Sequence, residues 1–155
     1  MKNSPVRPLL RGDLDRVGHL VGVNDMFPPE LLEGMTAPYF DGDGAEHRWI
    51  VFDDRRVVAA AYYVPEPLTD GTWNVLMICV DPLEHGSGKG SALMRHIEAE
   101  LLSQGVRILL VETSGVPAFE RTRQFYHMLG YDQEARIRDY YAEGDDKIIF
   151  RKALA

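Results

Sequence analysis

The chain has 155 residues, of which 45% are hydrophobic and 26% are charged, and it carries a formal net charge of −7. This length supports a single domain, 1–155, with its own core, and the acidic balance argues against a general nucleic-acid binder, which needs a clustered basic face. The single cysteine excludes an internal disulfide framework, and with no predicted signal peptide or membrane helix we expect a cytoplasmic protein.

The first third of the sequence predicts one strand and two helices. An extended run at residues 6–10 ends before Asp13, which stands where a helix N-cap is expected. Two prolines, Pro28 and Pro29, are tolerated in the first turn of a second helix, and a flexible loop is expected at residues 41–44. The apolar positions after Asp13 recur at helical spacing: Leu14, Val17, Leu20 and Val21.

Three strands joined by short polar turns are expected next, at residues 49–52, 57–64 and 73–80. They are rich in β-branched and aromatic residues, which suit a pleated, half-buried surface. Because the turns between them are short, the three strands are predicted to form an antiparallel meander. A glycine-rich loop then leads into a helix whose apolar stripe ends before Gly105.

The last part of the chain returns to strands around one further helix. Residues 106–111 form a nearly continuous apolar strand, the kind that is covered on both faces. A helix is expected over residues 119–129, followed by strands at 131–141 and 147–152. The complete order, β-α-α-β-β-β-α-β-α-β-β, predicts an α/β fold with helices packed on a mixed sheet.

The segment with the clearest chemistry is the glycine-rich loop between the meander and its helix. Backbone N–H groups without a neighbouring Cβ, placed at a helix N-terminus, form a site for an anion such as phosphate. A P-loop would need glycine at position 83 and serine or threonine at position 90, but the chain has Leu83 and Gly90. A dinucleotide-binding fingerprint also matches poorly, because Ser91 takes its third glycine position and a meander precedes the loop. A plain flexible turn is the remaining alternative.

This loop resembles motif A of the GNAT N-acetyltransferases, in the form His85-Gly86-Ser87-Gly88-Lys89-Gly90. The resemblance implies the GNAT acyl-CoA N-acyltransferase fold, with acetyl-CoA as co-substrate. It implies that Ile78 and Val80, at the end of the preceding strand, pair with the pantetheine arm. It also implies that the diphosphate of coenzyme A is held by the backbone of His85, Gly86, Ser87, Gly88, Lys89, Gly90 and Ser91. His85 departs from the family pattern, which usually has Gln or Arg there, so only its backbone N–H is expected to contribute.

A second match lies downstream, where Gln124 to Tyr131 resembles the family's aromatic-Tyr-x-x-x-Gly-aromatic segment. The resemblance implies that Tyr126 is the general acid that protonates the departing thiolate of coenzyme A. Aminolysis of a thioester expels a thiolate, which a nearby phenol can stabilise or protonate. The alternative is that Tyr126 is an aromatic packed on an amphipathic helix. Phe119 and Thr122 replace the Asn and Ala of the common family pattern, so contacts of that Asn are not assumed.

A base is also required, because an ammonium acceptor must lose a proton before it attacks. Glu112 is the candidate, since it stands at the end of a buried strand, where a carboxylate is costly unless it is paired or functional. The comparable position is the proposed base in GNAT enzymes that acetylate protein N-termini. The alternative is that Glu112 braces the loop at residues 113–117, and the sequence leaves both interpretations open.

The acceptor side is less defined by the sequence. Residues 25–46 contain six carboxylates and no Lys or Arg, so they either attract a cationic amine or form a solvated acidic surface. Tyr140 and Tyr141 loosely resemble a pair found in N-terminal peptide acetyltransferases. Cys79 is interpreted as a small core residue rather than a nucleophile, and the five histidines lack metal-ligand spacing, so no metal site is predicted.

Together the two motifs predict an N-acetyltransferase that moves an acetyl group from acetyl-CoA to the amine of a small molecule or peptide. No nucleic-acid or membrane partner is expected. The identity of the amine, the acyl-chain preference and the choice between monomer and homodimer are left open. The alternatives are a non-catalytic GNAT domain that senses acyl-CoA or regulates a partner, and a nucleotide-binding module that uses the same loop.

Overall fold

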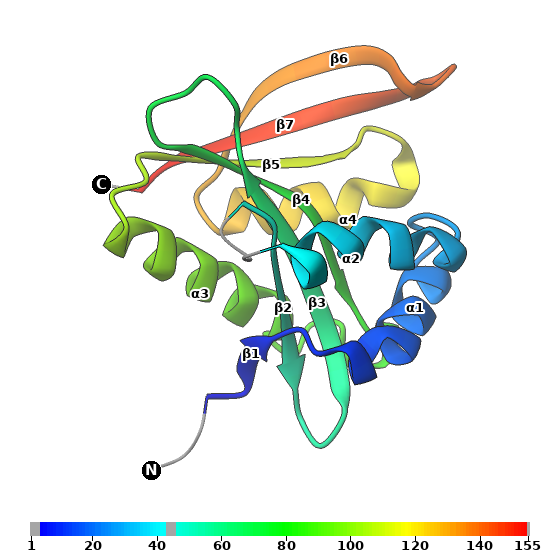
Figure 1. Ribbon diagram of the computed structural model, residues 1–155. Helices are drawn as coiled ribbons and strands as arrows, with labels where there is room; N and C mark the ends of the chain where they lie inside the picture. Colours follow the sequence, from blue (N-terminus) through cyan, green and yellow to red (C-terminus); the bar gives the residue numbers. More distant parts are fainter. Residues whose placement is uncertain (1–3, 43–45, 155) are drawn as a thin grey trace.

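The computed structural model describes residues 4–42 and 46–154, and in this part of the chain seven strands and four α-helices follow the predicted order (Figure 1). The strands are β1 (Val6–Pro8), β2 (Arg48–Asp53), β3 (Val57–Pro65), β4 (Thr72–Val80), β5 (Ile108–Ser114), β6 (Asp132–Ala142) and β7 (Asp145–Ala153). The helices are α1 (Leu14–Val23), α2 (Leu32–Asp41), α3 (Lys89–Ser103) and α4 (Glu120–Met128). Short 3₁₀ turns lie ahead of the helices, at Arg11–Asp13, Pro29–Leu31, Pro82–Glu84 and Pro117–Phe119.

The strands form one sheet in the order β1-β2-β3-β4-β5-β7-β6, which confirms the predicted mixed α/β architecture. β2, β3 and β4 make the predicted antiparallel meander. β4 and β5 pair in parallel, and the connection between them passes through α3, because parallel neighbours need a crossover. β7 inserts between β5 and β6, so the C-terminal hairpin forms one end of the sheet (Figure 1).

Helices cover both faces of the sheet, and each face has its own hydrophobic core. Successive residues of β3 alternate between the two cores: Ala59 and Ala61 face α3 and α4, whereas Ala60 faces α1 and α2. The core under α3 and α4 includes Tyr63, Leu93, Ile97, Leu109, Tyr126 and Phe150. The core under α1 and α2 includes Val17, Leu20, Trp49, Tyr62, Met77 and Cys79.

The α1/α2 layer covers only part of its face. Among the described residues, its core contains none from β5, β6 or β7. Every residue of β6 is exposed, and the β6–β7 hairpin runs along one side of the molecule away from α1 and α2 (Figure 1). On one face of β5 and β7, the side chains are therefore not covered by the α1/α2 layer. This face is called the open face below.

α1 starts where the sequence predicts, directly after Asp13, but the Asp13 side chain is used differently from a typical N-cap. Asp13 does precede the helix, but it lies in a 3₁₀ turn with helical backbone angles, and its side chain caps no amide of α1 among the described residues. Its carboxylate instead accepts the N–H of Leu10 at 2.8 Å and pairs with the Arg7 guanidinium at 2.8 Å. Asp13 is thus the N-cap residue, as predicted, but its side chain makes no cap hydrogen bond to α1, because the carboxylate is already used to tie β1 to the turn.

The second helix starts as expected after Pro28 and Pro29, through a 3₁₀ turn. Of the loop predicted at residues 41–44, Asp41 is the last residue of α2 and Gly42 follows it, while residues 43 and 44 lie outside the described residues. None of the helices within residues 4–42 and 46–154 is long and apolar enough to cross a membrane.

Candidate active site

The parallel strands β4 and β5 separate half-way along their length. Pairing runs from Thr72 opposite Ile108 to Val75 opposite Val111 and stops there. Beyond this point β4 pairs only with β3, and β5 only with β7, among the described strands. Figure 1 shows the two strands diverging from the middle of the sheet. One edge of β4, over residues 76–80, is therefore left without a strand partner.

Two residues of β4 present their backbone groups to this open edge. The Asp81 amide donates to the carbonyl of Val58 in β3 at 2.7 Å, so the backbone of Asp81 faces β3. Because successive residues of a strand direct their N–H and C=O groups to opposite sides, those of Val80 and Ile78 face the open edge. The two strand residues predicted to pair with pantetheine thus lie at the edge that has no partner strand.

A bulge in β4 marks the point where the strands separate. The register with β3 shifts between Tyr62 and Tyr63, which leaves Leu76 without a partner on β3 and 39% exposed. After the bulge, Cys79 faces the α1/α2 core, where burial raises the pKa of its thiol to about 12. Cys79 is therefore the small core residue that the sequence predicts, on the face opposite α3 and α4.

The glycine-rich loop connects β4 to α3 through two glycines with left-handed backbone angles. Gly86 has φ +79° and Gly88, the residue before α3, has φ +86°, a region that other residues rarely adopt. Gly90 is required for a different reason, because a Cβ there would lie 3.3 Å from the Phe125 ring of α4 and 3.4 Å from the Val80 side chain. This close approach brings α3, α4 and β4 together beside the loop.

Several amides of the loop are free to bind an anion. Those that donate no hydrogen bond within the described residues are Gly86, Gly88, Lys89, Gly90 and Ser91. The last three belong to the first turn of α3, where the helix dipole also favours negative charge. The amides of His85 and Ser87 donate inside the loop instead, to Pro82 at 3.4 Å and Glu84 at 3.2 Å.

The side chain of His85 is used within the loop. Its Nε2 lies 3.0 Å from the Val80 carbonyl oxygen, which also accepts the side-chain amide of Asn24 at 3.0 Å. Both contacts fix the end of β4 relative to the loop and to α1. They also occupy the Val80 carbonyl, so the N–H of Val80 and the backbone of Ile78 are the groups that stay available at the open edge.

Two cations lie beside the loop. Lys89 Nζ is 3.6 Å from the carboxylate of Glu84. Arg121 of α4, which the sequence did not suggest, places its Nη2 3.8 Å from the position that a Cβ on Gly86 would take. No local signal marks Arg121, because only the packing of α4 beside the loop brings it there.

Tyr126 lies in α4 and is buried, with 1% of its surface exposed. Its ring packs against Phe125, Tyr131 and Phe150. Burial raises the pKa of its phenol above the ordinary value of 10.0, and the nearby Tyr141 adds to the increase. The hydroxyl makes no hydrogen bond to any described residue. Tyr126 Oη is not one of the fully buried side-chain atoms that lack a partner among the described residues, so the hydroxyl is accessible and free to donate to a bound molecule.

Glu112 belongs to a polar cluster on the open face of β4, β5 and β7. Its Oε1 accepts a hydrogen bond from Asn74 Nδ2 at 2.8 Å and pairs with Lys147 Nζ at 2.9 Å. The Lys147 ammonium also lies 3.9 Å from the centre of the Tyr140 ring. Glu112 Oε2 makes no hydrogen bond within the described residues, so one oxygen of this carboxylate is held and the other is free.

The sequence matches the family model described as Acetyltransferase (GNAT) family over residues 21–131, which is most of the chain. The chain belongs to the GNAT acetyltransferases. A crystal structure described as a GNAT-family acetyltransferase from Desulfovibrio desulfuricans is similar at a TM-score of 0.87 and 30% identity, covering 97% of this chain and 98% of that one.

More distant acetyltransferase structures share the fold. The ribosomal-protein-S18-alanine N-acetyltransferase from Escherichia coli matches at a TM-score of 0.77 and 21% identity, over 97% of this chain and 93% of that one. A protein described as an acetyltransferase from Salmonella typhimurium, solved with acetyl-CoA, matches at a TM-score of 0.74 and 15% identity, over 99% and 95% of the two chains. Among curated proteins, no significant match was found.

In this GNAT protein the predicted residues fall on two sides of the diverging strands. The loop amides and Tyr126 lie on the side of α3 and α4, whereas Glu112 lies on the open face. Sequence reasoning missed Asn74 and Lys147, which contact Glu112. Asn74 carried an available signal, because it is a polar residue inside an otherwise apolar strand.

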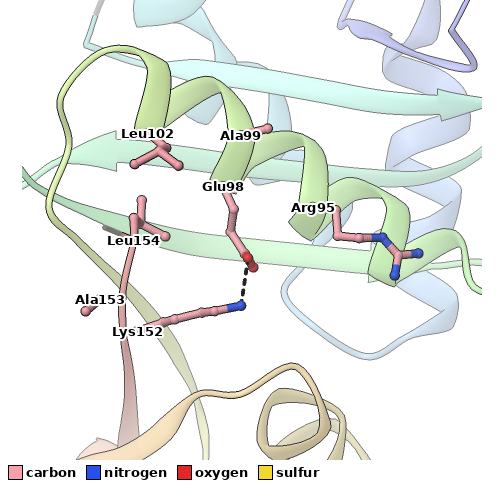
Figure 2. A pocket seen from close by; sticks show the side chains of 7 residues that line it. All are labelled: Arg95, Glu98, Ala99, Leu102, Lys152, Ala153 and Leu154. Carbon is pink, nitrogen blue, oxygen red and sulfur yellow. Dashed lines mark hydrogen bonds and ion pairs between the residues drawn. The ribbon is translucent and has the colours of Figure 1, made fainter.

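A separate hollow of about 350 Å³ lies between α3 and the end of β7 (Figure 2). Inside it Glu98 pairs with Lys152 at 2.8 Å, and the Lys152 ammonium also donates to the Leu129 carbonyl at 2.9 Å. None of the predicted site residues of the GNAT protein lines it. Its lining consists of Arg95, Glu98, Ala99, Leu102, Lys152, Ala153 and Leu154.

Proposed function

We propose that this GNAT protein transfers the acetyl group of acetyl-CoA directly to a primary amine of a small molecule or peptide. The observation that carries the proposal is the continuity of the open β4 edge with the free amides at the start of α3. An extended arm that contains amides can add to an open strand edge, and a diphosphate can accept free N–H groups at a helix N-terminus. Acetyl-CoA contains both parts, joined in this order.

Tyr126 is proposed as the general acid. Its raised pKa keeps the phenol protonated at neutral pH, so it can donate a hydrogen bond to the sulfur as the C–S bond breaks. Proton transfer to the thiolate then completes the departure of coenzyme A. The hydroxyl supports this role, because it has no partner among the described residues and is not enclosed by them, so a bound molecule can reach it.

Glu112 is proposed as the base. Asn74 and Lys147 hold its Oε1, which leaves Oε2 to accept a proton from the acceptor ammonium. The free amine then attacks the thioester carbonyl and a C–N bond forms. The C–S bond breaks, and the second proton that the nitrogen loses replaces the one that Tyr126 gives to the thiolate. Glu112 and Tyr126 lie on opposite faces of the sheet, at the point where β4 and β5 part, so the base and the acid approach the reacting carbon from different sides.

The test is acetyl-CoA-dependent thiol release against a panel of primary amines and short peptides with free N-termini. We expect release that depends on the acceptor, and we expect Glu112→Gln to lower kcat by roughly 100-fold or more, because the amide cannot take up a proton. Gln retains an oxygen that can accept from Asn74 and Lys147, so the fold is expected to survive the change.

The matched control is Glu98→Gln. Glu98 is also paired with a lysine, Lys152, at 2.8 Å, but it lies in the separate hollow beside α3. We expect Glu98→Gln to leave kcat unchanged. Equal losses in the two variants would remove the case for Glu112 as the base, and tight binding of acetyl-CoA without release to any amine would refute the proposed transfer.

A further inference from the structure

At the open face of the sheet, one side-chain nitrogen donates hydrogen bonds to two carboxylates. Asn74 Nδ2 donates to Glu66 Oε1 at 2.8 Å and to Glu112 Oε1 at 2.8 Å. Glu66 follows the end of β3, and Glu112 lies in β5, so the two are distant in sequence and meet only at Asn74 of β4. Each hydrogen of the Asn74 amide is therefore used to hold one carboxylate.

Holding the two carboxylates leaves one buried polar atom of Asn74 without a hydrogen bond, which costs stability. The residue is 2% exposed, and its Oδ1 has no hydrogen-bond partner within residues 4–42 and 46–154. Rotating the amide would place Oδ1 against two carboxylates, so the orientation is fixed by its neighbours. A buried amide with an unsatisfied carbonyl is less stable than an apolar side chain of the same size, which indicates that the residue is retained for what its N–H groups hold.

The cluster has one positive charge fewer than it has carboxylates. Glu66 and Glu112 carry two negative charges, and Lys147, whose Nζ pairs with Glu112 at 2.9 Å, supplies one positive charge. Among the described residues, Glu66 has no cationic partner. Carboxylates held close together repel each other, so one further cation between them would stabilise the cluster.

We propose that the ammonium group of the acceptor binds between Glu66 and Glu112, and that Asn74 is the positioning residue that holds both carboxylates for it. This inference rests on the acetyltransferase function proposed above and defines the acceptor as a primary amine that arrives as a monocation. Glu66 fixes the ammonium, and Glu112 takes up one of its protons. A primary ammonium has the three N–H donors needed to contact both carboxylates and still present the nitrogen to the thioester.

The experiment follows the Asn74 side-chain amide by ¹H–¹⁵N NMR while methylammonium chloride is added to the full chain. Methylammonium is a primary ammonium, and tetramethylammonium, which has the same charge and no N–H donor, is the comparison salt. We expect methylammonium alone to shift the Asn74 side-chain signals. Glu66→Gln should weaken its binding roughly tenfold, because one charge is lost while an oxygen that can accept from Asn74 is kept. Glu98→Gln is the matched control and should leave the binding unchanged.

A second variant separates a positioning role from a structural one. Asn74→Leu removes the unsatisfied carbonyl, so we expect its Tm to equal or exceed that of the wild type. Methylammonium binding, followed in this variant and in the wild type at the backbone amide of Glu112, should be lost. The absence of any shift, equal shifts with both salts, or undiminished binding in Glu66→Gln would each overturn the proposal. In the same samples acetyl-CoA is followed at the Gly86 and Gly88 amides. If these do not respond, the proposed function fails whatever the result with methylammonium.

Discussion

The two sides of the point where β4 and β5 diverge are built in different ways. On the α3/α4 side, the open strand edge and the free amides belong to one continuous segment, residues 78–91, and nearly all the groups available for binding are backbone groups. On the open face, Glu66, Asn74, Glu112 and Lys147 come from four separate segments, and every polar contact among them is made by side chains. A site made of local backbone tolerates varied side chains, whereas a site made of distant side chains can change its ligand by a few substitutions.

The largest expected effect is that of Tyr126→Phe, which tests the residue proposed as the acid on the α3/α4 side. We expect kcat to fall roughly 100-fold or more, with the KM for acetyl-CoA unchanged. The free energy of unfolding should be unchanged, because the hydroxyl has no hydrogen-bond partner among the described residues. Steady-state kinetics and urea denaturation measure the two quantities.

Tyr131→Phe is the control for that change. Tyr131 lies in the same core, but its hydroxyl donates to Glu98 at 2.8 Å. Removing this bond should cost about 1 kcal/mol of stability and leave kcat intact. If Tyr126→Phe also lost stability and kept its turnover, the phenol would be a packing residue and not an acid.

Gly90→Ala is expected to have an intermediate effect. It tests the α3/α4 side, where most of the groups available for binding are backbone groups. The new Cβ would lie 3.3 Å from the Phe125 ring and 3.4 Å from the Val80 side chain, so α3 must shift away from α4 and β4. We expect a loss of about 1 kcal/mol in stability and a several-fold rise in the KM for acetyl-CoA, because the first-turn amides of α3 move with the helix. The KM for the amine should not change.

Gly34→Ala provides the comparison for Gly90→Ala. A Cβ at this position in α2 meets no atom within 4 Å, and replacing a helical glycine should stabilise the protein by about 0.5 kcal/mol. Thermal denaturation and the acetyl-CoA dependence of the rate distinguish the two variants. A rise in KM for both would show that the effect does not depend on the contact at the loop.

The smallest expected effect is on the pH dependence of stability, and it concerns Asp81, which lies between β4 and the glycine-rich loop. The Asp81 carboxylate accepts the Leu83 N–H at 3.0 Å and pairs with Arg16 at 2.6 Å, and these contacts lower its pKa below 3.8. A lowered folded-state pKa contributes stability that is present above the unfolded value and is lost as the pH falls through the folded value. Asp81→Asn should therefore be less stable than the wild type at pH 7, by about 1 kcal/mol, and the difference should shrink below about pH 4. Urea unfolding at the two pH values measures the difference, and a gap that persists at low pH would contradict this account.

Much of the fold could be predicted, because its signals are local. The order of strands and helices follows from hydrophobic periodicity and from the turns between them, and the structure agrees with it throughout the described residues. Asp13 was the exception, since a carboxylate before a helix predicts a cap, yet Arg7 and the Leu10 amide bind it first. Such competition between partners is decided by packing and is not visible in a window of sequence.

The sequence by itself determined the family, the element order and the loop at residues 85–91, because these depend on glycine positions and periodic apolar residues within short stretches. The tertiary structure alone decided that β4 and β5 part after Val75 and Val111, and that Arg121 stands beside Gly86. It also brought Glu66, Asn74 and Lys147 to Glu112. These contacts join residues as much as 38 positions apart, from Asn74 to Glu112. The physical reason is that backbone conformation is set by neighbours in the chain, whereas side-chain contacts between strands are set by the register and twist of the whole sheet.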